Sequence, residues 1–143
     1  MKFKSLNRNG AQTFALIFDT GDEVVSGLVD FAKQKGLRGS HFTAIGAFRD
    51  VTLGYFEWDK KKYKRIAVNE QVEVLTLAGD IAVQDGAPQL HAHVVVGMAD
   101  GSARGGHLVE GHVRPTLEVI LSEEPLGMVR EFDPASGLAL IQV

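Results

Sequence analysis

One segment of the chain has the spacing of an amphipathic helix, and this restricts the folds open to the sequence. The apolar residues that recur three and four positions apart are Val24, Val25, Leu28, Phe31 and Ala32. Ahead of them, Thr20-Gly21-Asp22-Glu23 has the form of a capping box, in which Thr20 and Glu23 satisfy each other's backbone amides. Gly36 suits the left-handed residue that ends many helices. We therefore predict a helix over residues 21–35.

Most of the remaining chain is rich in β-branched and aromatic residues, which favour strands. The predicted strands cover residues 12–19, 42–48, 51–58, 63–68, 72–78, 90–96 and 116–121. Near the end, 128–132 and 138–143 flank Asp133-Pro134-Ala135-Ser136-Gly137, which suits a hairpin connection. This pattern predicts an α+β fold: an antiparallel sheet of about seven or more strands with one main amphipathic helix packed on it. We expect a single domain over residues 1–143.

Composition and charge weigh against several classes of function. Fifteen basic and eighteen acidic residues give a net charge of -3, whereas DNA-binding domains usually carry a basic excess. The sequence has no cysteine, so any metal must be held by nitrogen and oxygen. Residues 1–6 lack the apolar core of a signal peptide, and no apolar run reaches the roughly 18 residues of a membrane span. We expect a cytoplasmic protein that does not contact membranes.

The histidines carry the strongest functional signal. In the predicted strand over residues 90–96, alternation places His91 and His93 on one face and the apolar residues on the other. Zinc commonly takes three protein ligands and keeps a fourth position open, so an adjacent strand should supply a third ligand. His107 is the candidate, because residues 98–106 contain the turn signal Asp100-Gly101 and a flexible Gly105-Gly106 pair. The sequence predicts zinc, or another divalent transition metal, at these three histidines.

Other polar residues are weaker candidates. His112 is a spare ligand close to a bend suggested by Pro115, and His41 precedes a strand far from the cluster and is expected to be structural. The candidates for accessory groups are Glu73, Arg104 and Glu118. Each of these three, taken alone, is better interpreted as ordinary exposed charge. The clustered histidines also have an alternative interpretation, in which they bond to carboxylates or face a groove.

Several segments together resemble the PPC domain, the plants and prokaryotes conserved domain that follows AT-hooks in plant nuclear proteins. The segments are Leu90-His91-Ala92-His93-Val94, Gly105-Gly106-His107-Leu108-Val109-Glu110-Gly111, Thr116-Leu117-Glu118-Val119-Ile120, Gly36-Leu37-Arg38, Ile45-Gly46-Ala47, Leu53-Gly54-Tyr55 and Val72-Glu73-Val74-Leu75. The resemblance implies a homotrimer of α+β subunits. It also implies zinc at His91, His93 and His107, and an association with DNA that is taken from the plant relatives.

Two departures from the plant proteins weaken the DNA association. The AT-hook core Arg-Gly-Arg-Pro, which enters the minor groove in the plant proteins, does not occur in this sequence. Plant members also carry Gly-Arg-Phe-Glu-Ile, a segment linked to association with other nuclear factors, where this chain has Glu70-Gln71-Val72-Glu73-Val74. The sequence therefore lacks both the groove-reading element and the plant type of partner segment.

Three functions remain open from the sequence. The first is a regulator associated with DNA, for which the aromatic and basic stretch 58–65 offers local support, although we prefer to interpret it as a solvated hairpin turn. The second is a zinc-dependent enzyme that acts on a small carbonyl or carboxylate, because the PPC fold resembles that of acetolactate decarboxylases. The third is a sensor that captures a small anionic ligand at the metal. We prefer a binding module to an enzyme.

Overall fold

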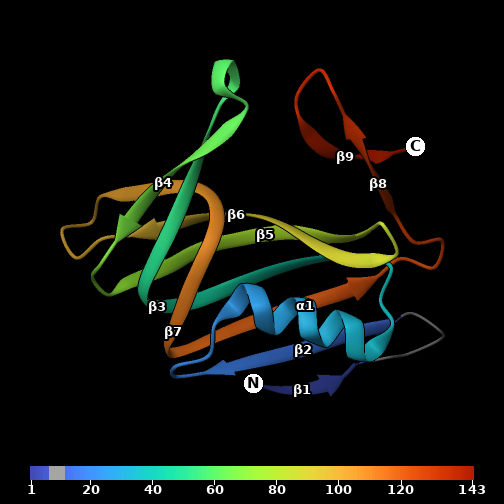
Figure 1. The fold of residues 1–143 in the computed structure, drawn as a ribbon. Helices are drawn as coiled ribbons and strands as arrows, with labels where there is room; N and C mark the ends of the chain where they lie inside the picture. The colour runs from blue at the N-terminus through green and yellow to red at the C-terminus, as the bar shows by residue number, and fades with distance from the viewer. Residues whose placement is uncertain (7–11) are drawn as a thin grey trace.

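The computed structural model describes residues 1–6 and 12–143, which form one α-helix and a nine-stranded sheet (Figure 1). The elements are β1 (Lys2–Ser5), β2 (Gln12–Asp19), α1 (Val24–Lys35), β3 (Gly39–Glu57), the 3-10 turn η1 (Trp58–Lys60), β4 (Lys62–Val68), β5 (Val72–Gln84), β6 (Ala87–Gly97), β7 (Ala103–Glu123), β8 (Val129–Asp133) and β9 (Leu138–Gln142). The described strands pair antiparallel, except that β8 lies parallel to β5. This confirms the predicted α+β class.

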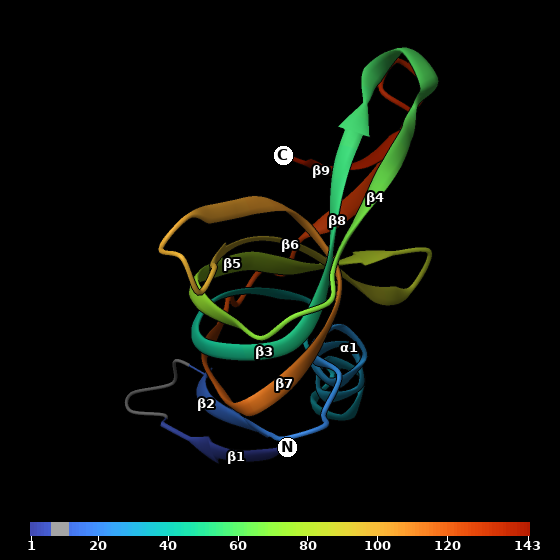
Figure 2. The ribbon, with the colours of Figure 1, turned by 90° about the vertical axis from the view of Figure 1, so that its left-hand side faces the viewer.

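Two long, bent strands close part of the sheet on itself. β7 pairs with β2 through residues 116–123, with β3 between residues 107 and 123, and with β6 through residues 103–107. β6 in turn pairs with β5, and β5 pairs with β3, so β3, β5, β6 and β7 form a closed ring of pairings (Figure 2). Register shifts in β3 next to Gly46 and Phe48 accompany the bend. This closure brings the chain around residue 93 beside the chain around residue 107.

The helix packs its apolar face on the sheet, as its sequence spacing predicts. Val24, Leu28, Phe31 and Ala32 are buried, and the Phe31 ring meets that of Phe14 on β2 edge to face, with centroids 5.2 Å apart. Burial of each large side chain here contributes about 1.5–3 kcal/mol. The helix contacts β6 and β7, so the core supports the apolar face of the strand that carries the first two histidines.

The start of the helix differs from the capping-box prediction. The helix begins at Val24, and its N-cap is Glu23, whose carboxylate accepts from the amides of Val25 at 3.0 Å and Ser26 at 2.7 Å. Thr20 is not the cap, because its hydroxyl donates instead to the Pro115 carbonyl at 3.0 Å. The predicted C-terminal residue is confirmed, since Gly36 is left-handed with φ 66°.

The strand predictions were correct in type but often too short. Residues 42–48 and 51–57 belong to the one continuous strand β3, which includes the charged residues between them and has register shifts there. The last residue of the second predicted strand, Trp58, instead begins the turn η1. The predicted strand 116–121 is the end of β7, which starts at residue 103 because a strand tolerates the Gly105-Gly106 pair here. The short, exposed edge strand β1 was not predicted. The predicted hairpin near the end of the chain is confirmed as β8 and β9.

Two hairpins project from the body side by side, the β3–β4 hairpin and the β8–β9 hairpin (Figures 1 and 2). They are joined where the Lys61 ammonium donates to the Pro134 carbonyl at 2.8 Å. The stretch 58–65 is thus a hairpin connection with its following strand, as predicted. Within residues 1–6 and 12–143, no helix has both the length and the apolar character needed to cross a membrane.

Candidate metal centre

The β5–β6 hairpin fixes the positions of His91 and His93. Its two-residue turn is Asp85-Gly86, and both residues have positive φ, 51° and 81°, as type I′ turns require. The turn sets the register, which places Asp80 opposite His91 and Ala78 opposite His93. Both imidazoles lie on the face that points away from the core, while the neighbouring Ala92 and Val94 are buried. The predicted alternation is confirmed.

The turn between β6 and β7 returns His107 to this pair. The Asp100 carboxylate accepts from the Ser102 amide at 2.9 Å within the turn, and the two strands then pair so that His107 lies directly opposite His93. Gly106 permits the close approach of β3, because a Cβ atom at this position would lie 2.7 Å from the Gly54 carbonyl oxygen. The hairpin connection and the role expected of the glycine pair are therefore observed.

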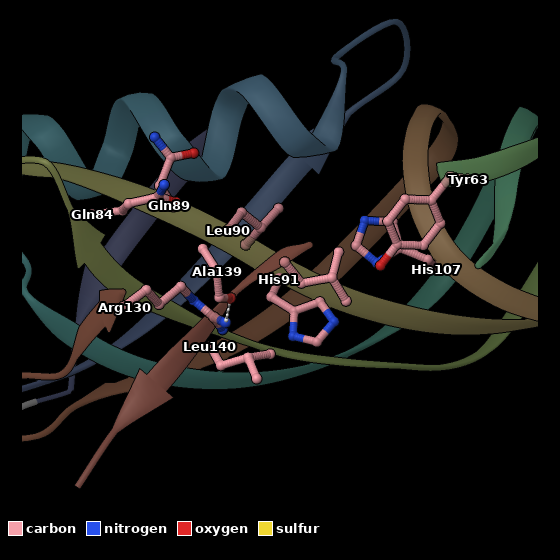
Figure 3. A pocket seen from close by; sticks show the side chains of 10 residues that line it. Tyr63, Gln84, Gln89, Leu90, His91, His107, Arg130, Ala139 and Leu140 are labelled. Atoms are coloured by element: carbon pink, nitrogen blue, oxygen red, sulfur yellow. Dashed lines mark hydrogen bonds between the residues drawn. The ribbon is translucent and has the colours of Figure 1, made fainter. Parts of the chain in front are cut away.

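The three imidazoles form a compact cluster. One ligand atom from each of His91, His93 and His107 can be chosen so that all three lie within 4.8 Å of one another. The ring centroids are 5.1 to 5.7 Å apart. Tyr63 on β4 packs against the outer side of the His107 ring, with centroids 4.6 Å apart (Figure 3). Three convergent imidazoles within this span fit the ligand geometry of a divalent transition metal.

The electrostatics of the cluster favour neutral imidazoles at His107 and His91. Burial, reinforced by the neighbouring histidines, lowers the pKa of His107 to about 4. Burial also lowers the pKa of His91, as do Arg130 and His93, against an opposing effect of Asp80. Nδ1 of His107 is buried and has no hydrogen-bond partner within the described part of the chain. Neutral rings with free lone pairs are the form in which histidine binds metals, so the donor set fits such an ion.

A pocket opens beside two of the histidines. It has a volume of about 210 Å³, and its lining residues are Tyr63, Gln84, Gln89, Leu90, His91, His107, Arg130, Leu138, Ala139 and Leu140 (Figure 3). Part of the wall therefore comes from the β8–β9 hairpin, near the end of the chain. The histidine cluster thus has an open side that is bordered by apolar side chains and by two glutamine amides.

The remaining candidates lie away from this pocket. His112 on β7 forms a 2.7 Å hydrogen bond to Asp50 instead of joining the cluster. His41 is exposed and lies 3.3 Å from the Glu124 carboxylate. Glu73 and Glu118 line a separate hollow on the outer face of the sheet, together with Ile45, Gly46, Val74 and Leu75. Arg104 is exposed and pairs with Val96 through the backbone of β7.

Sequence reasoning did not identify Asp80, Arg130 and Tyr63, which lie around the cluster. Asp80 had a usable signal: the Asp85-Gly86 turn pairs residue 84 with 87 and, counting back along both strands, residue 80 with 91. Arg130 and Tyr63 had none, because their positions depend on how the β8–β9 and β3–β4 hairpins pack against the body.

Comparisons with known proteins identify the family and several similar structures. The model of the Plants and Prokaryotes Conserved (PCC) domain matches residues 6–125, which leaves β8 and β9 outside the match. A plant- and prokaryote-conserved (PPC) protein of Pyrococcus horikoshii is 32% identical, with a TM-score of 0.86 over 99% of this chain and 95% of that one. The metal-containing protein AF0104 of Archaeoglobus fulgidus is also 32% identical, with a TM-score of 0.84 over 99% and 97%.

Two further proteins are similar to this chain. A protein of Bacteroides thetaiotaomicron described as a "putative DNA-binding protein" is 26% identical, with a TM-score of 0.88 over 98% of this chain and 96% of that one. The "Bifunctional protein GlmU" of a Synechococcus strain is 30% identical over 120 residues, which are 82% of this chain. The chain spans only 18% of the length of that curated relative.

A more distant match concerns the fold alone. A Staphylococcus aureus protein described as similar to alpha-acetolactate decarboxylase is 11% identical, with a TM-score of 0.57 over 85% of this chain and 53% of that one. At this level of identity the likeness extends to the architecture and not to chemistry.

Proposed function

Because this chain belongs to the plants and prokaryotes conserved domain family, we propose that it is a homotrimeric binding module whose three-histidine site holds zinc and which acts in DNA-associated regulation. The histidine cluster carries the proposal. Its three ligand atoms lie within 4.8 Å of one another, and a buried nitrogen of His107 has no hydrogen-bond partner among the described residues.

The choice of zinc follows from the donor set. Three imidazole nitrogens without a thiolate suit zinc, and copper, iron and nickel also accept imidazole, whereas magnesium and calcium prefer oxygen. A bound zinc ion would supply a Lewis-acidic coordination position to a ligand. The metal-containing relative from Archaeoglobus fulgidus supports the presence of a metal in this family.

The open side of the cluster supports a small anionic ligand. The pocket of about 210 Å³ starts at His91 and His107 and is walled by Leu90, Leu138 and Leu140. A divalent ion on three neutral histidines carries a net positive charge, which attracts an anion. A thermal-shift screen of small carboxylates, with and without zinc, tests this part of the proposal. Stabilisation by an acid only when zinc is present is the expected result.

Exposed apolar residues support the trimer. Ile45, Leu75, Val95 and Ile120 are 61%, 53%, 37% and 49% exposed. They come from the four neighbouring strands β3, β5, β6 and β7, and each alternates with a buried residue, so they share the face opposite the core. Such a face gains by contact with further copies of the chain. Light scattering should give three times the chain mass of 15.5 kDa, and Ile45→Asp with Ile120→Asp should reduce it.

The regulatory role has two supports, both modest. The relative from Bacteroides thetaiotaomicron is described as a "putative DNA-binding protein". The β3–β4 hairpin, which forms a projecting arm, also carries exposed lysines beside the exposed rings of Tyr55 and Trp58; the lysines are Lys60, Lys61, Lys62 and Lys64. In a trimer three such arms would act together, which raises a weak affinity. Anisotropy titration at low salt tests it: no binding to duplex or single strands at high micromolar protein removes the DNA association.

Metal content is the decisive experiment for the site. Elemental analysis of protein purified without chelators or nickel resin should find about one zinc per chain. His93→Ala should lose the metal and keep the native fold, since His93 is exposed. A matched variant, His41→Ala, changes an exposed histidine outside the cluster and should keep the metal. Metal-free wild-type protein, or equal zinc content in all three proteins, would contradict the proposal.

The enzyme alternative has less support. Glu73 and Glu118 line a different hollow from the histidines, so neither carboxylate has a position from which to act as acid or base at the cluster. The distant decarboxylase-like match concerns the fold alone. Turnover of any small carbonyl substrate by the wild type, abolished in His93→Ala, would favour this alternative.

A further inference from the structure

A buried ion pair joins the β8–β9 hairpin to the strand opposite His91. Arg130 on β8 is only 8% exposed. Its guanidinium donates to the Ala139 carbonyl on β9 at 3.0 Å (Figure 3). It also donates to Oδ1 of Asp80 on β5 at 2.5 Å. One arginine therefore holds a carboxylate of the body and both strands of the hairpin in a fixed arrangement.

The two oxygens of Asp80 face different partners. Oδ1 is bonded to Arg130, whereas Oδ2 lies 3.9 Å from Nδ1 of His91. This contact exceeds hydrogen-bond length, so it is electrostatic in the structure. Asp80 lies directly opposite His91 in the β5–β6 ladder, so the backbone register itself keeps the two side chains together.

We propose that Asp80 is a positioning residue for His91 and that Arg130 acts on the metal site through Asp80. The inference rests on the metal function proposed above. A carboxylate beside Nδ1 of a histidine ligand selects the tautomer with the proton on Nδ1, orients the ring and leaves Nε2 to face the metal. Arg130 contributes by fixing the carboxylate and by keeping its position independent of solvent.

The alternative is that Arg130 only fastens the hairpin. Besides this ion pair, the ladder pairing of β8 with the body within the described residues is Val83 with Val129. Just before β8, Met128 accepts from the Val83 amide at 2.8 Å and donates to the Arg38 carbonyl at 2.9 Å. Arg130 is therefore an important attachment in either case. The two interpretations differ in what they predict for zinc affinity. If Arg130 only attaches the hairpin, Asp80 orients His91 without help from Arg130.

The hairpin and the metal should also affect each other. Leu138, Ala139 and Leu140 of the hairpin line the same pocket as His91 and His107. If Arg130 and Asp80 connect the hairpin to the metal ligand His91, the effect is reciprocal. Zinc binding must then stabilise the docked hairpin by the same free energy by which the docked hairpin strengthens zinc binding. Hydrogen exchange of residues 129–142 should therefore slow when zinc is added to the wild type.

A double-mutant cycle tests the connection. Zinc affinity is measured by competition with a chromophoric chelator for the wild type, Asp80→Asn, Arg130→Gln and the double variant. Asp80→Asn should weaken zinc binding roughly 10–100-fold, as loss of an outer carboxylate does. Arg130→Gln should weaken it less, and the double variant should match Asp80→Asn, because Arg130 acts through Asp80. The absorption spectrum of bound cobalt should change in the same variants.

The control separates attachment from positioning. Lys61→Gln removes another contact of the hairpin, the 2.8 Å bond to the Pro134 carbonyl, without touching Asp80. It should leave zinc affinity and the cobalt spectrum unchanged. Wild-type affinity in Asp80→Asn, or single effects that add in the double variant, would overturn the inference while the metal function stands.

A measurement on the wild type guards against variants that fail to fold. Nitrogen-15 NMR of the zinc-loaded protein should show His91 ligated through Nε2 and protonated on Nδ1. Ligation through Nδ1 would overturn the inference without any substitution. Wild-type protein that binds no zinc at all would instead reject the metal function itself and this inference with it.

Discussion

Strand β7 carries two histidines with opposite surroundings. His112 bonds through Nδ1 to the Asp50 carboxylate at 2.7 Å, and Asp50 is also bonded to Arg49 at 2.6 Å. His107, five residues earlier, has a buried Nδ1 without any partner among the described residues, and its ring lies among two other imidazoles. Nδ1 of His112 therefore has a hydrogen-bond partner in the protein, and Nδ1 of His107 has none among the described residues.

The difference shows that two histidines on the same strand can have different chemistry, because a carboxylate accompanies one and the other is buried among imidazoles. Burial acts to raise the pKa of Asp50, but its bonds to Arg49 and His112 outweigh this and lower the pKa. At His107, burial and neighbouring imidazoles lower the pKa to about 4, which favours the neutral ring. A paired histidine stabilises the fold, whereas a neutral histidine without a hydrogen-bond partner, such as His107, is suited to a metal.

The largest expected effect is on metal affinity. His107→Ala should weaken zinc binding by more than the roughly 10–100-fold that loss of an outer-sphere partner costs, because it removes a direct ligand. His112→Ala should leave the affinity within about twofold of the wild type, since His112 is engaged by Asp50. Chelator competition at pH 7.5 measures both. Equal losses in the two variants would remove the distinction between the histidines.

The second effect concerns pH and the metal-free protein. An unfolded histidine titrates near 6.5, whereas His107 in the fold titrates near 4, so the unfolded chain binds more protons between these values. The contribution of His107 to the free energy of unfolding should therefore be fully present above about pH 6.5. It should be lost as the pH drops toward 4. We expect a loss of about 1–2 kcal/mol, less than the full shift implies because the ring is only partly buried.

Urea unfolding at pH 7 and pH 5 measures this loss. His107→Asn should show a smaller loss than the wild type, with a remainder from His91, whose pKa is also lowered. His41→Asn, at an exposed position, should retain the wild-type loss. A His107→Asn protein with unchanged pH dependence would show that folding does not lower the pKa of His107.

Local periodicity was enough to predict the fold class and the shared face of His91 and His93. Strand alternation has a fixed period, and the Asp100-Gly101 turn restricts where His107 can return, so short-range signals determine the cluster. The same logic applied to Asp85-Gly86 would have found Asp80. These residues belong to two hairpins, whose registers are set by their turns.

The parts that sequence could not predict depend on long-range packing. Arg130 reaches Asp80 from a hairpin 50 residues away in sequence, and no local pattern marks that contact. Glu73 and Glu118 were reasonable accessory candidates as strand carboxylates, yet the closed ring of strands directs them to another hollow. The helix start was missed because Glu23, three residues past the expected cap, satisfies the first helical amides itself.

Glu23 also supports the segment that holds His112, which gives a third prediction. Its carboxylate caps α1 and accepts from the Gly111 amide at 3.2 Å. Glu23→Ala should lower the free energy of unfolding by about 1 kcal/mol, as loss of an N-cap does. Thr20→Ala should cost less, because Thr20 is not the cap. Chemical denaturation checks both, and a larger cost at Thr20 would restore the capping box.

The smallest effect is the stability that His112 itself provides. His112→Ala removes a hydrogen bond to a charged carboxylate, but the pair is partly exposed and Asp50 keeps Arg49 as a partner. The free energy of unfolding should therefore fall by only about 0.5–1 kcal/mol. The loss should shrink in high salt, because exposed charges are screened.

In the metal-free protein, His93→Ala should lower the free energy of unfolding by less than His112→Ala does, since the exposed His93 ring lies beside two other imidazoles. If His93→Ala proved the more damaging of the two, the clustered histidines would be stabilising the fold without a metal, and the contrast with the paired histidine would fail.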